Sequence, residues 1–293
     1  MNKSMNTSTS PNRTVTILTT GPQALIQDLG RPGNAHLGVP PSGAVDPRSL
    51  TLANRLVGND ETAAGLELLL GGLTLTAGTS CTIAVTGPPT EVRVDGRLAD
   101  SHHPVHLEPG QTLAIGTPAT GLRTYLALSG GIDVEEELGS RSTDLLSGIG
   151  PDPLRDNDVL RLGTPGTPRG ADVVPPHHAP ETLVVPILLG PRDDWFEDAE
   201  TQLRQGSWTV SDRSNRVGTR LHGTKLNRRD GEIPSEGMVT GAVQVPPDGQ
   251  PVVFLNDHPT TGGYPVIGVV DRDHLRFLGQ ARPGTRIGFR PAD

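Results

Sequence analysis

The chain has 293 residues and a formal net charge of -8 at pH 7, which argues against a long basic surface for nucleic acid. With 37 glycines, 28 prolines and 33% hydrophobic residues, the composition favours many short strands and excludes a globally disordered chain. No segment has the ~20 apolar residues of a membrane span, and the start lacks a secretory apolar run. We therefore expect a cytoplasmic protein with no membrane association and a disordered tail over residues 1–13.

Short apolar runs separated by glycine and proline turns predict strands of four to six residues between residues 14 and 163. These runs are TVTIL, LTLTA, CTIAV, TEVRV, QTLAIG and RTYLAL. One helix is predicted among them, because Asp46 can cap its start, Pro47 suits its first position and Gly58 can end it. The single cysteine, Cys81, excludes an internal disulfide and is predicted to be buried.

A proline- and glycine-rich stretch over residues 164–181 has no hydrophobic periodicity and is typical of a linker. Strand-like runs resume after it: TLVVPILLG, SWTV, GAVQVP, PVVFL, PVIGVV and TRIGF, with a short helix over 273–278. The sequence thus predicts a mainly β protein with a first domain over 14–163 and a second over 182–293.

The first polar patch, QDLGRPGNAHLGVPPSGAVD, spans residues 27–46. A loop of this length in a compact domain favours function, with a structural Ω-loop as the alternative. Its glycines allow close approach of the backbone to a ligand. Its candidate side chains are Gln27, Asp28, Arg31, His36, Ser42 and Asp46.

The second polar patch, residues 211–226, concentrates basic residues in an acidic chain: Arg213, Arg216, Arg220 and Lys225. Guanidinium groups suit carboxylates and phosphates, so this patch is a candidate anion site. The segment GTRLHGTK has the glycine spacing of a phosphate-binding loop but not its Lys-Ser/Thr ending or its strand–loop–helix frame, and we reject that interpretation.

The third polar patch, residues 228–265, contains the turn signal PPDG and the segment TTGGY. Thr260, Thr261, Gly262 and Gly263 are predicted to form a backbone nest for a carboxylate or phosphate oxygen, with Tyr264 as one wall. The other polar candidates of the patch are Glu232, Glu236, Gln244, Asp248, Gln250 and Asp257.

Histidine pairs at 102–103 and 177–178 do not have the spacing of a common zinc site, and no nucleophile elbow Gly-x-Ser-x-Gly occurs in the required frame. We therefore predict neither a metal site nor a serine hydrolase triad.

Five stretches together resemble a known family: QDLGRPG…GVPPSGAVD, ANRLVGND…GLELLLGG, SNRVGTRLHG, SEGMVTGAVQVPPDGQPVV and TTGGYPVIG. The sequence is similar to the carboxyltransferase family that includes the C subunit of 5-oxoprolinase, KipA, allophanate hydrolase subunit 2 and part of urea carboxylase. The resemblance implies two cyclophilin-like β-barrel domains with a few short helices.

For function, the resemblance implies the C subunit of an ATP-dependent 5-oxoprolinase, which opens the pyroglutamate lactam to glutamate. Its partners would be a KipI-like B subunit together with a LamB/YcsF-like A subunit, with ATP and Mg²⁺ bound by this chain or by a partner. One alternative is a non-catalytic KipA-type antagonist that binds a KipI-like kinase inhibitor. Another is the carboxyltransferase component of a split biotin enzyme; neither Lys3 nor Lys225 lies in a biotin-attachment sequence, so biotin would be carried by another chain.

The resemblance also implies site residues in three roles. Anion-handling residues would be Arg31, Arg216 and Arg220. Acid/base residues or metal–nucleotide contacts would be Asp28, Glu236 and Asp257. Substrate-orienting residues would be Ser42, Asn215, Thr261 and Tyr264, beside Thr260, Gly262 and Gly263.

Overall fold

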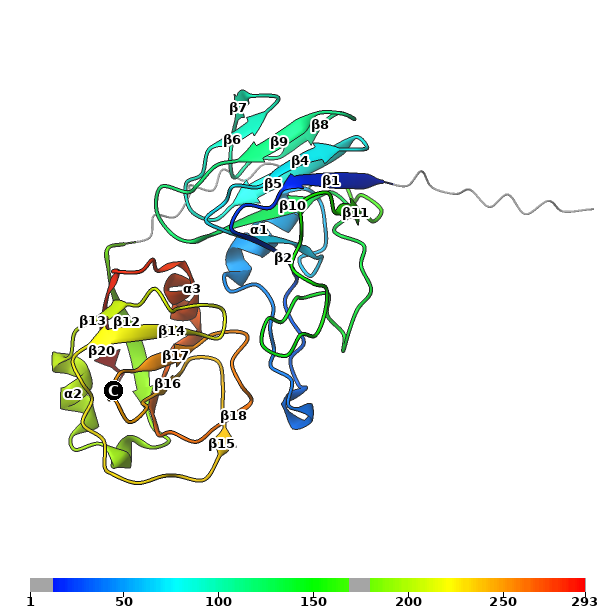
Figure 1. Cartoon of the computed structure of the whole chain (residues 1–293). Helices are drawn as coiled ribbons and strands as arrows, with labels where there is room; N and C mark the ends of the chain where they lie inside the picture. Colours follow the sequence, from blue (N-terminus) through cyan, green and yellow to red (C-terminus); the bar gives the residue numbers. More distant parts are fainter. Residues whose placement is uncertain (1–12, 169–179, 293) are drawn as a thin grey trace, which may run out of the picture.

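The computed structural model describes residues 13–168 and 180–292. Within these ranges the protein is mainly β with three short α-helices, which confirms the predicted fold class (Figure 1). No helix in the described ranges is both long and apolar enough to cross a lipid bilayer.

The first part of the chain forms two packed sheets, which we call the two-sheet unit. The order of the six-stranded sheet is β11-β1-β4-β9-β6-β7, and that of the five-stranded sheet is β2-β3-β10-β5-β8. Their strands are β1 (Thr14–Thr19), β2 (Gln23–Gln27), β3 (Gly65–Leu69), β4 (Thr74–Ala77), β5 (Cys81–Thr86), β6 (Val92–Val94), β7 (Arg97–Ala99), β8 (Val105–Leu107), β9 (Thr112–Ile115), β10 (Arg123–Leu128) and β11 (Val159–Arg161).

Alternating burial along β1 and β4 fills the space between these sheets with aliphatic side chains, including Ile17, Leu75 and Leu113. The edge strands β7 and β8 belong to different sheets and are not hydrogen-bonded to each other. The first half is therefore a pair of sheets rather than a hydrogen-bonded closed barrel.

Helix α1 (Pro47–Leu56) packs on the outside of β5 and β10 and begins as predicted. The Asp46 carboxylate accepts from Ser49 N, and Pro47 lies at the start of the helix. The buried Ala53 and Leu56 pack against Ala84 and Ala127 of the sheet. This helix fixes the end of the 27–46 loop.

The second part of the chain is a closed barrel in the order β12-β19-β16-β17-β14-β13-β20, which we call the barrel. Its strands are β12 (Thr182–Leu189), β13 (Trp208–Val210), β14 (Gly218–Gly223), β16 (Ala242–Gln244), β17 (Val252–Phe254), β19 (Val266–Val270) and β20 (Arg286–Pro291). A separate two-stranded ribbon joins β15 (Glu236–Gly237) to β18 (Thr261–Gly262). The barrel core is aliphatic around Trp208 and Phe289.

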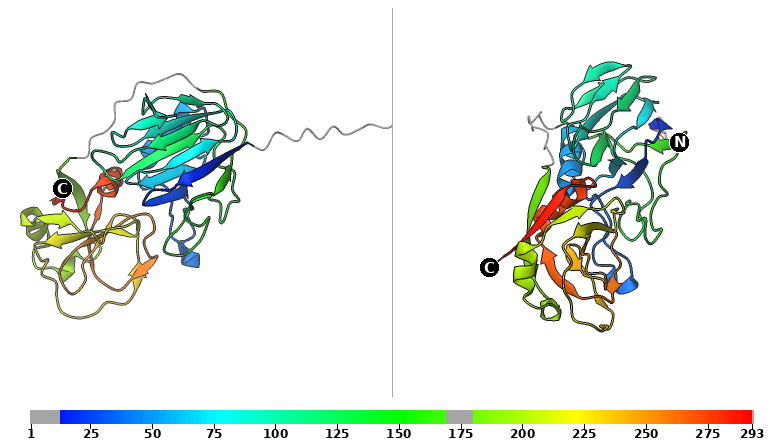
Figure 2. Two further views of the ribbon diagram at one scale, coloured as in Figure 1. Left: turned by 45° about the horizontal axis from the view of Figure 1, so that its top comes forward. Right: turned by 60° about the vertical axis from the view of Figure 1, so that its left-hand side comes forward.

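The remaining helical segments are η1 (Ala35–Leu37), η2 (Asp193–Trp195), α2 (Ala199–Gln205) and α3 (Arg272–Gln280). Figure 2 shows α3 between the barrel and the two-sheet unit. At this junction Gly279 faces Val45, and the Gln280 side chain accepts from the backbone N–H groups of Leu122 and Arg123. A helix of the barrel is thus part of the contact between the two units.

Several local predictions are confirmed. Cys81 is buried, Gly249 N closes the PPDG turn on Pro246 O, and α3 covers the predicted 273–278 helix. The elements that sequence reasoning missed are α2 and the strands β2, β3, β7, β8, β11, β14, β15 and β18. Sequence reasoning assigned part of β14 to an anion patch. The predicted linker falls partly outside the described residues, as does the predicted tail except for Arg13, which donates to Ser129 O. The predicted domain boundaries stay predictions.

Candidate functional site

A buried ion cluster joins the barrel to the two-sheet unit. Arg216, in the turn before β14, donates from Nε and Nη2 to both carboxylate oxygens of Asp257, at 2.8 and 2.9 Å. Its Nη1 donates to Glu67 Oε1 of β3 at 2.6 Å, and its Nη2 also donates to Gly43 O at 2.7 Å. The three charged side chains are at most 3% exposed, so ion pairs and hydrogen bonds among them take the place of hydration by water.

The electrostatics of this cluster favour its charged forms. Burial acts to lower the pKa of Arg216, but the nearby Glu67 and Asp257 carboxylates outweigh burial and raise it above the ordinary value. Burial acts to raise the pKa of Glu67, and Arg216 and Arg123 overcome this and lower it. The predicted anion-handling residue Arg216 thus holds two carboxylates of its own chain.

Two further groups belong to the cluster. The Tyr125 hydroxyl donates to Glu67 Oε2 at 2.8 Å and accepts from Asp46 N, while Arg123 Nε lies 3.3 Å from Glu67 Oε1. Burial raises the pKa of Tyr125 well above its ordinary value, with Glu67 and Asp46 adding to the effect. Sequence reasoning missed Glu67, although one acid within the apolar run GLELLL is a signal for a buried ion pair.

Asp28, a predicted catalytic residue, accepts four hydrogen bonds within the protein. Its Oδ1 accepts from Gly30 N, Ser140 Oγ and Ser142 Oγ, at 2.7, 2.6 and 2.6 Å. Its Oδ2 accepts from Arg141 N at 2.6 Å. The carboxylate therefore joins the 28–45 loop to the 137–150 loop.

Arg31 joins the same two loops. It is 1% exposed, and it donates from Nε to Glu137 O and from Nη2 to Ser142 O. Its Nη1 has no hydrogen-bond partner within the described residues. The Arg31 side chain lies beneath the surface. Its predicted anion-handling role stays a prediction.

Ser42 and the segment around Asp257 connect the predicted first and third patches. Ser42 Oγ donates to Asp257 Oδ1 at 3.0 Å, and Leu145 N donates to Asp257 Oδ2 at 3.3 Å. Asn256 Nδ2 donates to the carbonyl groups of Ser42, Gly43 and Ala44. The structure thus brings Ser42, Arg216 and Asp257 together, while their assignment to a ligand site stays a prediction.

Another group of predicted residues lies on and beside the β15–β18 ribbon. Glu236 forms a bidentate ion pair with Arg192, which sequence reasoning did not select. This pair lowers the pKa of Glu236 and raises that of Arg192, chiefly through their hydrogen bonds. Tyr264 is 44% exposed, and its carbonyl accepts from Gln244 Nε2.

The predicted backbone nest at 260–263 is wrong in its geometry. Thr261 and Gly262 form strand β18, in register with Gly237 and Glu236, and neither Gly262 nor Gly263 has the positive φ that a nest requires. Packing explains why residue 262 is glycine, because a Cβ atom there would lie 2.5 Å from Gln244 Nε2. The assignment of residues 260–264 to ligand binding stays a prediction.

Two more predicted residues lie near β14. Asn215 accepts from Val217 N at 2.9 Å, so its side chain stabilises the turn that presents Arg216. Arg220 is exposed on the strand. Neither side chain contacts the ribbon through a hydrogen bond within the described residues.

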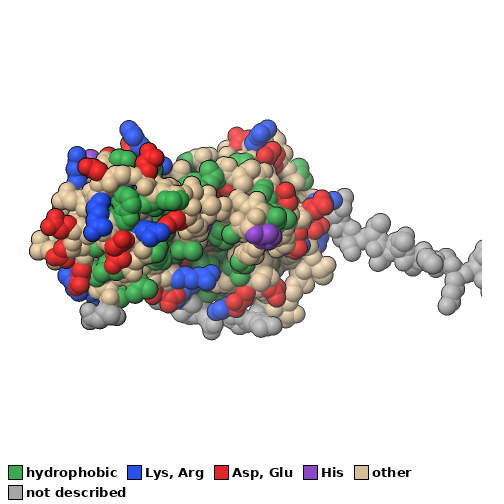
Figure 3. All heavy atoms as spheres, turned by 90° about the horizontal axis from the view of Figure 1, so that it is seen from below, with side chains coloured by type: hydrophobic (Ala, Val, Ile, Leu, Met, Phe, Trp, Pro, Cys, Tyr) green, Lys and Arg blue, Asp and Glu red, His purple; other side chains and the backbone are tan. Residues whose placement is uncertain are grey.

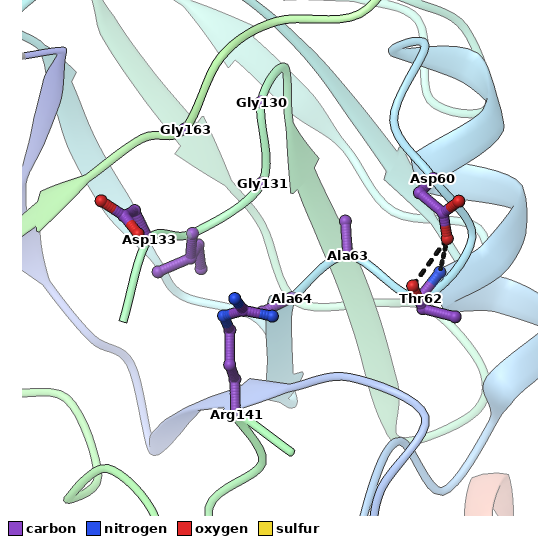
Figure 4. Close-up of a pocket in the computed structure, with 10 residues that line it drawn as sticks. Asp60, Thr62, Ala63, Ala64, Gly130, Gly131, Asp133, Arg141 and Gly163 are labelled. Carbon is purple, nitrogen blue, oxygen red and sulfur yellow. Dashed lines mark hydrogen bonds between the residues drawn. The ribbon is translucent and has the colours of Figure 1, made fainter. Parts of the chain in front are cut away.

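The two-sheet unit also has a surface cavity of about 310 Å³ that contains none of the predicted site residues. Arg141 and Ala64 both line this cavity, and Asp60 accepts from the backbone and the hydroxyl of Thr62 (Figure 4). The other lining residues are Ala63, Gly130, Gly131, Ile132, Asp133 and Gly163. Arg141 also pairs with Glu136 at 2.7 Å, outside this lining.

The arrangement divides the predicted site into a buried and an exposed part. The carboxylates of Asp28 and Asp257 are surrounded by donors of the same chain, whereas Thr261 and Tyr264 are exposed and Glu236 is half-buried. No group of three or more His, Cys, Asp or Glu suited to a metal occurs in the part of the chain that the structure describes.

Comparisons with known proteins agree on one family. The model for the carboxyltransferase domain, subdomain A and B, matches residues 37–291. The chain is 38% identical over 281 residues to the C subunit of 5-oxoprolinase from Escherichia coli, covering 93% of this chain and 89% of that protein. It is 33% identical to urea amidolyase of Saccharomyces cerevisiae, of which it spans 16%. A solved structure of Kluyveromyces lactis urea amidolyase superposes with a TM-score of 0.90 at 30% identity, covering 98% of this chain and 19% of that chain.

Proposed function

We infer a function from the premise that this chain belongs to the carboxyltransferase domain family, subdomain A and B. We propose that it acts as the C subunit of an ATP-dependent 5-oxoprolinase that converts pyroglutamate to glutamate. The observation that carries the proposal is the 38% identity to a 5-oxoprolinase C subunit over 281 residues, which exceeds the 33% identity to a urea amidolyase.

The geometry supports a shared site rather than a self-sufficient one. The candidate ligand contacts Thr261 and Tyr264 are exposed, whereas the candidate carboxylates Asp28 and Asp257 are buried and hydrogen-bonded within their own chain. A site that must exclude water for phosphoryl transfer needs a cover. In the proposal, a KipI-like subunit supplies this cover and a LamB/YcsF-like subunit completes the enzyme.

The three carboxylates predicted to contact the metal–nucleotide do not fit a Mg²⁺–ATP site by themselves. The carboxylates predicted to contact the metal–nucleotide, Asp28 and Asp257, accept hydrogen bonds from their own chain on both oxygens. Glu236 is occupied by Arg192. We therefore assign nucleotide binding to the partner subunits, and we assign to this chain the orientation of the substrate by residues 260–264.

Reconstitution tests the proposal. The purified KipI-like and LamB/YcsF-like subunits with ATP and 5-oxoproline are expected to release glutamate only when this chain is added. Glutamate release at the same rate without it would refute the proposal.

A second candidate function is carboxyl transfer in a split biotin enzyme, which the similarity to urea amidolyase favours. It predicts carboxylation of urea when a biotin-carrier protein and a biotin carboxylase are added with ATP and bicarbonate. The same preparation should then be inactive towards 5-oxoproline, which separates the two functions.

A further inference from the structure

Two long loops of the two-sheet unit carry an unusual number of exposed leucines. Five of the twelve most exposed large hydrophobic residues of the described chain lie on them: Leu29, Leu37, Leu138, Leu145 and Leu146, with 41, 58, 44, 39 and 50% exposure. We call residues 28–41 and 137–150 the leucine loops. Exposed apolar side chains gathered in this way and bordered by polar residues are typical of a protein interaction site.

The leucine loops are held rigid from below. Asp28 accepts from three groups on the second loop, and the buried Arg31 donates to two of its carbonyls. Asn34, next to η1, donates to Arg31 O at 3.0 Å and to Leu138 O at 3.5 Å. A surface fixed by buried polar groups loses little conformational entropy when another protein binds it.

The exposed charges beside the leucines are acidic. Asp133, Glu135, Glu136 and Glu137 are all exposed, Arg141 is half-buried and Arg31 is buried, and the exposed basic side chain of the first loop is His36. Arg141 pairs with Glu136, and Arg31 lies beneath the loops. Charge complementarity therefore requires basic residues around the apolar patch of a binding partner.

The leucine loops and the β15–β18 ribbon project from the same edge of the molecule, as Figures 1 and 2 show in different directions. Leu145 N donates to Asp257 Oδ2, which links the second loop to the segment that leads into β18. Figure 3 shows this face from below, with hydrophobic side chains in and beside the depression between the two lobes. Val239 and Tyr264, 54 and 44% exposed, extend the apolar surface along the ribbon.

We propose that the leucine loops are the docking surface for a partner protein that presents an apolar patch bordered by lysine or arginine. This inference rests on the proposed function, because it names the surface through which the shared site is completed. A partner seated on the loops would also cover Thr261 and Tyr264 and exclude water from them. The exposed ligand residues and the exposed leucines thus have one explanation.

Binding of the purified KipI-like subunit tests this surface. The double variant Leu37→Glu/Leu146→Glu is expected to weaken binding at least about 100-fold, because two carboxylates would be buried against an apolar patch. The control is Leu98→Glu, since Leu98 is 69% exposed on β7 at the opposite end of the two-sheet unit (Figure 1). Glu135→Lys is expected to reduce the association rate and its dependence on salt.

Titration calorimetry and thermal unfolding of each variant distinguish the outcomes. A folded double variant that binds the KipI-like subunit within about threefold of the wild-type chain would overturn the docking surface. If the enzyme reconstituted with that double variant is still active, the proposed function stands and only the docking surface is refuted. A wild-type chain that does not bind the KipI-like subunit but dimerises through Leu37 and Leu146 would overturn the proposed partner. If the two glutamates prevent folding, the double variant Leu37→Ser/Leu146→Ser takes their place. We expect it to bind the KipI-like subunit at least about tenfold more weakly than the wild-type chain. Unchanged binding would contradict the proposal.

Discussion

Arg216 Nη1 donates to Glu67 Oε1 at 2.6 Å, although 149 positions separate the two residues in the chain. The contact joins the barrel to β3 of the two-sheet unit, and both side chains are almost fully buried. Since Arg216 also binds Asp257, one guanidinium group fixes the barrel segment that leads to β18 against the two-sheet unit.

The variant Arg216→Met is expected to lower the free energy of unfolding by about 3–5 kcal/mol, because Glu67 and Asp257 would remain buried without their counter-charge. Urea unfolding followed by tryptophan fluorescence measures this change. The matched control is Arg220→Met, on the exposed side of β14, for which a change within about 0.5 kcal/mol is expected. A loss below about 1 kcal/mol for Arg216→Met would contradict the structural role of the cluster.

Acid should weaken the fold through Glu67. Its pKa in the folded protein is held below the ordinary value of 4.5, so its contribution to stability is present above that value and is lost as the pH falls below it. Unfolding free energies measured from pH 7 to pH 3 should therefore decline more steeply for the wild-type chain than for Glu67→Gln below about pH 4.5. Parallel curves for the two proteins would show that Glu67 does not contribute to the acid sensitivity.

Gly279 is predicted to be required by the contact between α3 and Val45. A Cβ atom at position 279 would lie 2.2 Å from Val45 Cγ1, and the branched valine side chain cannot easily move away. We expect Gly279→Ala to destabilise the protein by about 1–3 kcal/mol, as overpacked sites do, despite the higher helix propensity of alanine. In thermal unfolding, the double variant Gly279→Ala/Val45→Ala should lose less stability than the sum of the losses of the two single variants. Additive losses would show that the strain does not arise between these two residues.

Tyr264 should affect activity and not stability. Because its side chain is 44% exposed, Tyr264→Ala is expected to change the unfolding free energy by no more than about 0.5 kcal/mol. In the reconstituted 5-oxoprolinase, we expect it to lower kcat/KM at least about tenfold by removing one side of the substrate site. Leu188→Ala, at a 64% exposed position on β12, is the control and should leave kcat/KM unchanged. Equal rates for both variants would remove Tyr264 from the site.

Cys81 reports on opening of the two-sheet unit. It is the single cysteine of the chain, it is 2% exposed on β5, and burial raises its pKa. Both effects suppress reaction of the thiol, since the thiolate is the reactive form. We expect an aromatic disulfide reagent to modify the native protein only as fast as the sheets open, and to modify it at once in concentrated guanidinium chloride. Immediate reaction of the native protein would contradict the packing of β5.

Local sequence signals determined much of the fold. Apolar runs between glycine and proline turns gave most strands, and the Asp46-Pro47 pair gave the start of α1, because these features depend on neighbours in the chain. The strands β2 and β3 were missed because both of their faces are largely buried, and a buried run lacks the alternation that marks a strand. The sequence also indicated, through matching stretches over its length, the family that the comparisons show.

Only the tertiary structure decided which polar residues lie together and which of them face the solvent. Asp28, Arg31 and Arg216 have the side chains of an anion or proton-transfer site, yet each is buried and bound to groups of its own chain. The sequence could not distinguish these uses, because a guanidinium group binds a substrate carboxylate and a distant Glu67 through the same geometry. The choice depends on which carboxylate the fold places within hydrogen-bond distance, and that is fixed by contacts between residues far apart in the chain.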